Sequence, residues 1–296
     1  MHIIGSSSSR STSAWAIVLP FAGLLALDQP STQSPARTQP AAPASAEKIS
    51  VPLTDPAKPV RLEVGLLAGG LIVRGHDGRD VSVETRVRPD EDDGKPCKGC
   101  ERSGLTRLAN TASGLVIEEQ DNRVRIKSPA GNQAIDIIVL VPTKTSVKLS
   151  VVNEGDIVVE RIDGEIEVQN VNGAVTLTDV AGSVVAHALN DDLKVSMTRL
   201  DPKPMSFSSM NGDIDVTLPA DAKLNVKMES GSGDIESDFA VEMLPTTATQ
   251  KVEDKRSQGG ALRIVVDKAM VGRINGGGQE MTFKNFNGDI RIRKRR

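Results

Sequence analysis

The sequence is nearly without aromatic side chains. Its 296 residues include no Tyr, one Trp and five Phe, so that aromatic residues make up 2% of the chain. A core must therefore be built from aliphatic side chains, and the counts of 31 Val, 22 Leu and 19 Ile favour strands over helices. The scarcity of flat rings also argues against a surface that stacks on sugars.

The chain also lacks an excess of charge of either sign. There are 36 Lys and Arg against 39 Asp and Glu, which gives a net charge of -3. This balance excludes the strongly basic surface that binding to a phosphate backbone favours, and we expect no nucleic-acid partner. A composition of 38% apolar and 25% charged residues is too apolar for a wholly disordered chain.

Long apolar runs are absent except near the N-terminus, at residues 14–27. A helix of this length reaches about 21 Å, which is short of the roughly 30 Å hydrocarbon core of a bilayer. We therefore interpret residues 1–27 as a signal peptide, with an uncleaved N-terminal anchor as the alternative. Residues 28–58 are rich in Pro, Ala and Ser and read as a disordered linker. The mature chain is expected to be exported to the periplasm, the cell envelope or the outside, with no transmembrane span.

A nine-residue repeat is the most informative feature. Gly155, Gly164, Gly173 and Gly182 are nine residues apart, and a fifth unit begins at Asp191. Fourteen of the fifteen residues at the third, fifth and eighth positions of these units are apolar. A strand whose third and fifth side chains point inward directs its second, fourth and sixth outward. Two such units per coil predict an all-β fold, a narrow β-solenoid of stacked short strands.

An antiparallel meander or sandwich is the competing architecture. Asp-Gly and Asn-Gly pairs between alternating runs, as at residues 163–164 and 172–173, are also strong hairpin signals. The apolar eighth position next to each turn favours a bent coil, and we therefore prefer the solenoid. The β-strand-repeat domain is assigned to residues 59–296, with a loop insertion at residues 88–114.

Looser copies of the repeat follow at residues 211–218 (NGDIDVTL), 232–239 (SGDIESDF) and 287–294 (NGDIRIRK), with a glycine triplet at residues 276–278. Because the triplet is not followed by a helix, a bulge or a tight backbone crossing is expected there. These copies and the triplet resemble the bacterial putative-adhesin β-strand-repeat family of unknown function, whose relatives are grouped as toast-rack domains. The resemblance implies an all-β, β-helix-like fold and an envelope location, and it supplies no catalytic residues.

Two cysteines, Cys97 and Cys100, enclose Lys98 and Gly99 within the predicted loop insertion. In an oxidising compartment this pair predicts a structural disulfide. A redox dithiol is an alternative, but the flanking sequence offers no helix N-terminus to lower a thiol pKa. A zinc site is the third reading; its other ligands would have to come from His76, His187 and carboxylates.

Acidic residues are the other candidates for chemistry. The run at residues 90–93 lacks the spacing of a calcium loop and reads as a solvated acidic loop. Carboxylates that follow turn glycines invite comparison with polysaccharide-cleaving β-helices, although acidic residues are common beside turns for backbone reasons; they are Asp156, Glu165, Asp213, Asp234 and Asp289. His187 is expected at an exposed repeat position and His76 in a turn. We expect no catalytic residues, no metal and no cofactor.

Five of the last six residues are basic: Arg291, Arg293, Lys294, Arg295 and Arg296. They are candidates for contact with an anionic surface such as lipid headgroups or an acidic envelope polymer, at about 1 kcal/mol per charge near a charged membrane. A solvated end strand and tail is the alternative.

Together these features predict an exported, non-enzymatic solenoid that acts as a cell-envelope scaffold or adhesin-like interaction module. Its partner is an unidentified envelope protein or polymer, and the sequence does not define an oligomeric state. A sensory module of an envelope-stress system, using the Cys97/Cys100 loop, is the first alternative. A polysaccharide-active β-helix enzyme is the second.

Overall fold

The computed structural model describes residues 47–88, 113–129, 133–245, 250–254, 262–266 and 269–296. These residues form strands and turns and belong to one compact unit, residues 42–296. In this described part of the chain, no helix has the length and apolarity needed to cross a membrane. The sites predicted at Cys97 and Cys100, and the acidic run at residues 90–93, lie outside the described residues.

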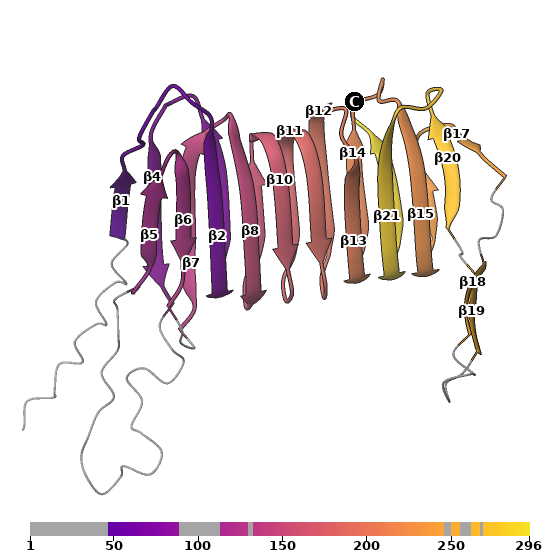
Figure 1. Ribbon diagram of the computed structural model, residues 1–296, viewed down its shortest axis with the longest axis horizontal. Helices are drawn as coiled ribbons and strands as arrows, with labels where there is room; N and C mark the ends of the chain where they lie inside the picture. Colours follow the sequence, from indigo (N-terminus) through magenta and orange to yellow (C-terminus); the bar gives the residue numbers. More distant parts are fainter. Residues whose placement is uncertain (1–46, 89–112, 130–132, 246–249, 255–261, 267–268) are drawn as a thin grey trace, which may run out of the picture. The chain divides into compact units, whose positions relative to one another are not determined.

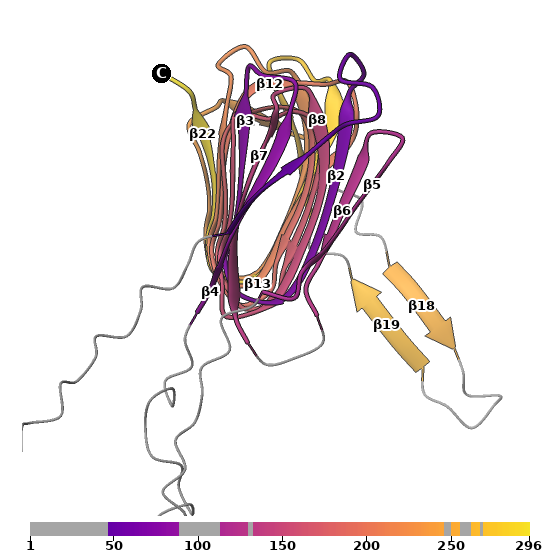
Figure 2. The same ribbon diagram turned by 90° about the vertical axis from the view of Figure 1, so that its left-hand side faces the viewer.

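The strands form two faces of a flattened solenoid (Figures 1 and 2). The front face contains, in spatial order, β5 (Val116–Gln120), β6 (Arg123–Lys127), β2 (Val60–Ala68), β8 (Thr145–Asn153), β10 (Asp163–Asn170), the second half of β11 (Val175–Ala188), β13 (Met205–Asn211), β21 (Gln279–Asn287), β15 (Leu224–Ser232), β20 (Met270–Ile274) and β17 (Val241–Met243).

The back face contains β1 (Glu47–Val51), β4 (Val81–Val87), β7 (Ile135–Pro142), β3 (Leu71–His76), β9 (Ile157–Glu160), the first half of β11, β12 (Leu193–Leu200), β14 (Ile214–Leu218), β22 (Ile290–Lys294) and β16 (Ile235–Ser237). A separate hairpin pairs β18 (Gln250–Asp254) with β19 (Leu262–Val266).

The register confirms two nine-residue units per coil. Val175 pairs in parallel with Ile157 on one side and with Leu193 on the other, and each lies eighteen residues away. The later coils are longer, since Leu193 pairs with Ile214. Parallel pairing between successive coils is the mark of a solenoid and excludes the meander for the repeat region. Among the described strands, antiparallel pairing is limited to both ends of the solenoid and to the β18–β19 hairpin.

The core lies between the two faces and is almost wholly aliphatic. All ten residues at the third and fifth positions of the five repeats are buried, as the pleat predicted: Ile157, Val159, Ile166, Val168, Val175, Leu177, Val184, Ala186, Leu193 and Val195. The eighth position differs between units. Ile162 and Val180 are buried, whereas Leu189 is 41% exposed because its coil turns after the preceding buried residue, Ala188. Three rings also fit inside, Phe207, Phe239 and Phe283, and the rings of Phe207 and Phe283 stack with centroids 5.4 Å apart.

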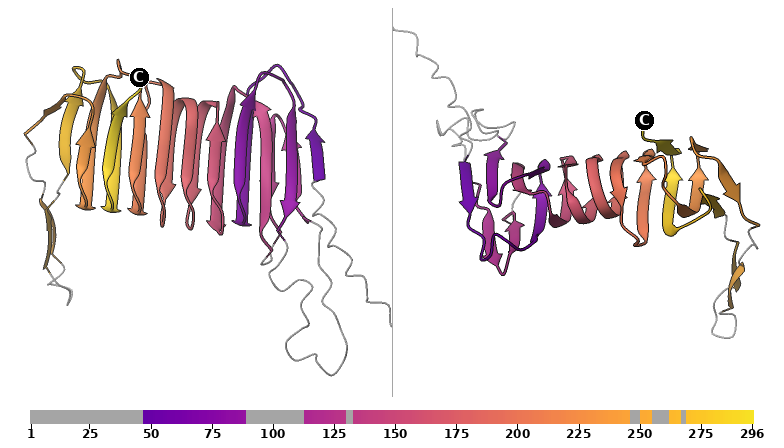
Figure 3. Two further views of the ribbon diagram at one scale, coloured as in Figure 1. Left: turned by 180° about the vertical axis from the view of Figure 1, so that it is seen from behind. Right: turned by 90° about the horizontal axis from the view of Figure 1, so that it is seen from above.

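Strands near both ends of the described chain are inserted between coils that are neighbours in sequence. The C-terminal strands β21 and β22 lie between β13/β14 and β15/β16, so the yellow strand in Figures 1 and 3 lies between orange ones. At the other end, β2 lies between β6 and β8, and β3 lies between β7 and β9. The last strand of the chain is therefore interior to the stack.

Repeat glycines permit close contact between coils where the chain turns. A Cβ atom at Gly155 would lie 2.1 Å from the carbonyl oxygen of Gly69, and one at Gly173 would lie 2.2 Å from that of Gly155. At the triplet, Gly276 and Gly277 have φ values of 84° and 87° in the turn between β20 and β21. A Cβ atom at Gly278 would lie 2.0 Å from the carbonyl oxygen of Lys223, so the triplet ends in a close backbone contact, one of the two arrangements expected there.

The ordered domain begins earlier than the sequence indicated. β1 pairs antiparallel with β4, and Val51 is buried against the core. Residues 47–58, which the composition assigned to the linker, therefore include a strand of the solenoid. An alternating run of only five residues beside a Pro-rich segment was too short to signal a strand.

Candidate functional site

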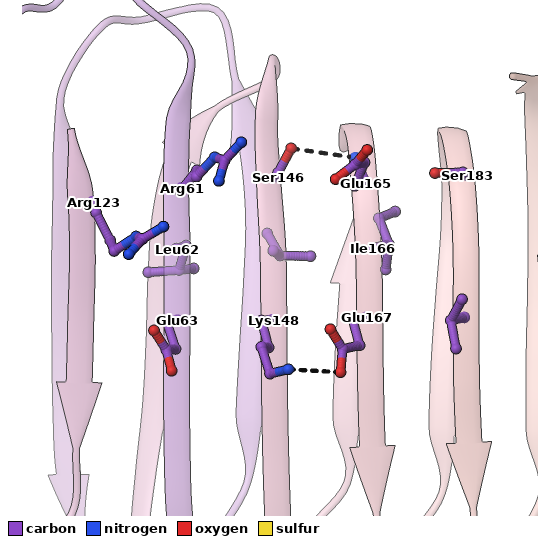
Figure 4. Close-up of a pocket in the computed structure, with 12 residues that line it drawn as sticks. Arg61, Leu62, Glu63, Arg123, Ser146, Lys148, Glu165, Ile166, Glu167 and Ser183 are labelled. Carbon is purple, nitrogen blue, oxygen red and sulfur yellow. Dashed lines mark hydrogen bonds and ion pairs between the residues drawn. The ribbon is translucent and has the colours of Figure 1, made fainter. Parts of the chain in front are cut away.

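An open groove on the front face is one of several shallow concavities among the described residues. It has a volume of about 420 Å³ and is formed by outward-facing residues of β6, β2, β8, β10 and β11 (Figure 4). Leu62, Val147 and Ile166 also border it, but their side chains are buried and point into the core. Pleat alternation places their charged neighbours on the surface, so the groove is lined by outward-facing charged and polar side chains and by Val185.

One row of the rim alternates in charge from coil to coil. Arg125, Glu63, Lys148 and Glu167 lie in register on four neighbouring strands. Arg125 contacts Glu63 at 3.1 Å and Lys148 contacts Glu167 at 2.7 Å. The hydrogen bond that Lys148 donates to Glu167 raises the pKa of the Lys148 ammonium. Because these pairs are exposed, each adds little to stability, but together they fix the charge pattern of the face.

The neighbouring row is cationic at one end. Arg123 and Arg61 lie opposite each other, followed in register by Ser146, Glu165 and Ser183 (Figure 4). The side chain of Lys203 donates to Glu165 and lowers the pKa of that carboxyl. A general acid must be protonated and therefore needs a raised pKa, whereas the lowered pKa of Glu165 favours its ionised form. The row can bind charged groups electrostatically and offers no acid–base pair.

The carboxylates after turn glycines serve the backbone of neighbouring coils. Asp289 N donates to Asp213 Oδ1 at 2.9 Å, and Asp234 N donates to Asp289 Oδ1 at 3.0 Å. Ala174 N likewise donates to Asp156 Oδ1 at 2.9 Å. Three of the five predicted acidic side chains, Asp156, Asp213 and Asp289, thus accept hydrogen bonds between coils. Asp234 takes part through its backbone N–H, and Glu165 lies on the front face. No group of three or more potential metal ligands occurs among the described residues.

The C-terminal basic residues are surrounded by carboxylates. Arg291 contacts Asp213, Asp289 and Glu236, and the hydrogen bond to Asp213 raises its pKa. Arg293 contacts Asp215, and Arg295 contacts Asp179 at 2.7 Å. Lys294 lies over the ring of Phe239 with Nζ 5.0 Å from its centroid, and Arg296 is exposed. Contact of these residues with an anionic surface stays a prediction.

The two described histidines occupy the predicted kinds of position. His187 is exposed on the front face, with Nδ1 2.5 Å from Ser208 Oγ. His76 ends β3, and its Nδ1 accepts a hydrogen bond from Gly78 N at 2.9 Å in the following turn.

A row of asparagines along one edge was not predicted. Each side-chain amide donates to the amide oxygen of the next coil, at 2.9 to 3.1 Å: Asn287 to Asn211, Asn211 to Asn190, Asn190 to Asn172 and Asn172 to Asn153. Stacked asparagines of this kind stabilise parallel in-register strands. Their spacing of 19, 18 and 21 residues in the sequence carries the signal, but Asn-Gly pairs read locally as turns.

Comparison with known proteins identifies the central part of the solenoid. Residues 147–269 match the family Toastrack DUF4097. Similar solved structures include a putative cell adhesion protein from Clostridium sporogenes, with 14% identity and a TM-score of 0.46 over 85% of this chain and 100% of that one. Putative adhesins from Bacteroides fragilis (10% identity, TM-score 0.39, 85% and 97% coverage) and Parabacteroides distasonis (10%, 0.27, 85% and 96%) are also similar. No curated protein matches the chain. The match of residues 147–269 to the Toastrack DUF4097 family confirms the resemblance found in the sequence.

Proposed function

We propose that this chain is an exported, non-enzymatic β-solenoid that acts as a scaffold or adhesin-like interaction module of the cell envelope. The observation that carries the proposal is the front face: a long, rigid surface on which ion pairs between coils hold an alternating charge pattern. A fixed pattern of this kind suits recognition of a charged polymer or protein, because complementary charge gives specificity.

The acidic residues support a binding role over catalysis. Asp213 and Asp289 are each engaged by a backbone N–H of the next coil and by Arg291. Carboxylates held in this way are acceptors with a structural task. The sensory alternative depends on Cys97 and Cys100, which lie outside the described residues, so no described residue favours it.

The experiment combines localisation with binding. Cell fractionation of the full chain is expected to recover it in the envelope or the medium, and the purified protein is expected to bind envelope fragments. The fourfold charge exchange Arg125→Glu/Glu63→Lys/Lys148→Glu/Glu167→Lys keeps both ion pairs but inverts the sign at every position. This reversal is expected to weaken that binding with little change in the melting temperature. Cytoplasmic recovery, or binding unchanged by the reversal, would contradict the proposal.

A second arm tests for an enzyme. Incubation with plant and bacterial polysaccharides is expected to release no new reducing ends. Release by the unsubstituted protein that disappears in Asp213→Asn would establish the enzymatic alternative.

We also propose that the exposed end of the basic segment contacts anionic surfaces. Deleting residues 291–296 would remove most of β22 from between β14 and β16, so substitutions are the better test. Arg295→Gln/Arg296→Gln is expected to weaken binding to vesicles that contain anionic lipid at low salt, with Lys194→Gln on the back face as the control. Equal binding by both variants would remove this role.

A further inference from the structure

A row of apolar side chains lies exposed along the carboxyl ends of the front-face strands. Its members occupy six consecutive coils: Leu67, Val152, Val171, Leu189, Met210 and Phe286. Leu67, Val152, Leu189, Met210 and Phe286 are 36–59% exposed, and Val171 is half-buried. Each follows a buried residue of known register, since Leu66, Val151, Asn170, Ala188, Ser209 and Asn285 pair in succession. We call this set the apolar row.

The apolar row is continuous and straight. At about 4.8 Å per coil it extends roughly 24 Å. Part of it borders a surface hollow of about 500 Å³, lined by Val171, Leu189, Met210 and Phe286 together with polar residues of the same strands. Isolated surface apolar residues need no explanation, but a contiguous exposed row marks an interaction site.

Neutral polar residues border the apolar row over its central coils. On one side lies the asparagine row described above. On the other side, Ser150, Gln169, His187 and Ser208 lie in register on successive strands. Charge appears only where this polar row ends: Lys127 lies at one end, and Lys284 and Glu229 lie at the other.

We propose that the apolar row is the interface with a second copy of this chain in the reverse orientation. The two-fold axis lies in the interface, parallel to the strands, and passes between the coils of Val171 and Leu189. It reverses the order of the coils, so that the first coil of the apolar row in one copy faces the last coil in the other. Lys127 then lies opposite Glu229 of the second copy, and Glu229 opposite Lys127. The large ring of Phe286 lies opposite Leu67. An isologous contact of this kind pairs unlike charges at both ends and closes as a dimer.

The same-direction dimer lacks this complementarity. A two-fold axis along the apolar row would place Phe286 against its own copy. It would also turn the polar row with Lys127 and Glu229 toward the asparagine row, where no opposite charge is available among the described residues. The charges at the ends therefore select the reversed arrangement.

The first experiment measures the mass of the purified chain in solution by sedimentation equilibrium. A concentration-dependent dimer is expected. Leu189→Glu, beside the proposed axis, is expected to weaken dimerisation at least tenfold, whereas Thr176→Glu on the back face, next to Lys194, leaves it unchanged. A protein that stays monomeric at about 100 μM, where a micromolar dimer would be almost complete, overturns the proposal.

A charge exchange tests the register. Lys127→Glu and Glu229→Lys are each expected to weaken the dimer, and the double variant Lys127→Glu/Glu229→Lys is expected to restore it. Because Glu229→Lys also loses its contact with Lys284, restoration in the double variant is the decisive result. A double variant that is weaker than either single variant overturns the reversed register.

Cysteine cross-linking tests the orientation. In the reversed dimer, oxidation is expected to link the double variant Leu67→Cys/Phe286→Cys but neither single variant. The unsubstituted chain, which contains Cys97 and Cys100, gives the background. Linking of Phe286→Cys alone supports the same-direction dimer and overturns the proposal. The proposal is also overturned if the introduced cysteines are protected from oxidation only when lipid vesicles or another protein are added.

Discussion

Asn287 donates a side-chain hydrogen bond of 2.9 Å to Asn211, which lies 76 residues earlier in the chain. This contact exists because the C-terminal coil, β21 and β22, lies directly against the coil of β13 and β14. Residues 224–237 precede the C-terminal coil in sequence but lie on its far side. The solenoid is thus closed by inserting its last coil between two earlier ones.

Deletion of residues 279–296 is predicted to unfold the C-terminal half of the solenoid. Removing β21 and β22 exposes Phe207 and separates β13/β14 from β15/β16. In an ordinary repeat protein the loss of a terminal unit shortens the stack and costs only one interface. Here we expect the cooperative urea transition to be lost or split. Deletion of residues 47–51, which pair only with β4, is the control and is expected to leave one weaker transition.

Asn211→Asp is predicted to destabilise the fold by about 1 kcal/mol. The carboxylate still accepts from Asn287, but it cannot donate to Asn190 and adds a charge to a neutral row. Chemical denaturation measures the change in the free energy of unfolding. Gln169→Glu makes the same chemical change on the same face outside the asparagine row and is expected to change stability by less than half as much. Equal effects would show that the asparagine row carries no special stability.

Gly155→Ala and Gly65→Ala are predicted to differ sharply. A Cβ at Gly155 meets the carbonyl oxygen of Gly69 at 2.1 Å, whereas at Gly65 nothing lies within 4 Å. Neither glycine has a positive φ, so the comparison isolates steric contact between coils. We expect Gly155→Ala to cost about 3 kcal/mol or more and Gly65→Ala to be neutral or slightly stabilising. Similar melting temperatures for the two variants would contradict the close packing of coils.

The sequence predicts the solenoid because pleat alternation and turn spacing are local properties. The residues at the third and fifth positions of each nine-residue unit are all buried for this reason. Leu189 has the apolar pattern of an inward residue, yet it lies outside, because where a coil bends depends on the coil against which it stacks.

The order of the coils is not local either. Copies such as residues 211–218 and 287–294 are similar enough that sequence alone cannot tell which copies will be neighbours. Asn287 of the asparagine row and Leu67 and Phe286 of the apolar row depend on that order, and they could not be placed before the register was known.

Val168→Asp is predicted to destabilise the domain by several kcal/mol, because it buries an unpaired carboxylate in the aliphatic core. Val168 is fully buried between the coils of Leu149 and Ala186. Gln169→Asp introduces the same side chain one residue later, where it points to solvent, and is expected to change stability by less than about 0.5 kcal/mol. An unchanged melting curve for Val168→Asp would overturn the inward assignment.

Stability is predicted to fall in acid, and Asp192 is predicted to be one cause. Asp192 Oδ1 accepts a hydrogen bond from Asp213 N at 3.0 Å, and this bond, with a smaller contribution from Lys194, lowers the pKa of the carboxyl. A group whose pKa is lower in the folded state stabilises the protein above its unfolded pKa, which is about 4 for Asp. That contribution is lost as the pH falls through the folded pKa.

Melting temperatures measured from pH 7 to pH 2 test this cause. Asp192→Asn, which cannot ionise, is expected to reduce stability near neutrality and to flatten the decline below pH 5, roughly where an Asp begins to be protonated in the unfolded chain. Lys194→Gln keeps the backbone hydrogen bond and is expected to retain most of the decline, because that bond is the larger cause of the lowered pKa. If Lys194→Gln flattened the profile as strongly as Asp192→Asn, the ion pair with Lys194 would be the dominant interaction instead.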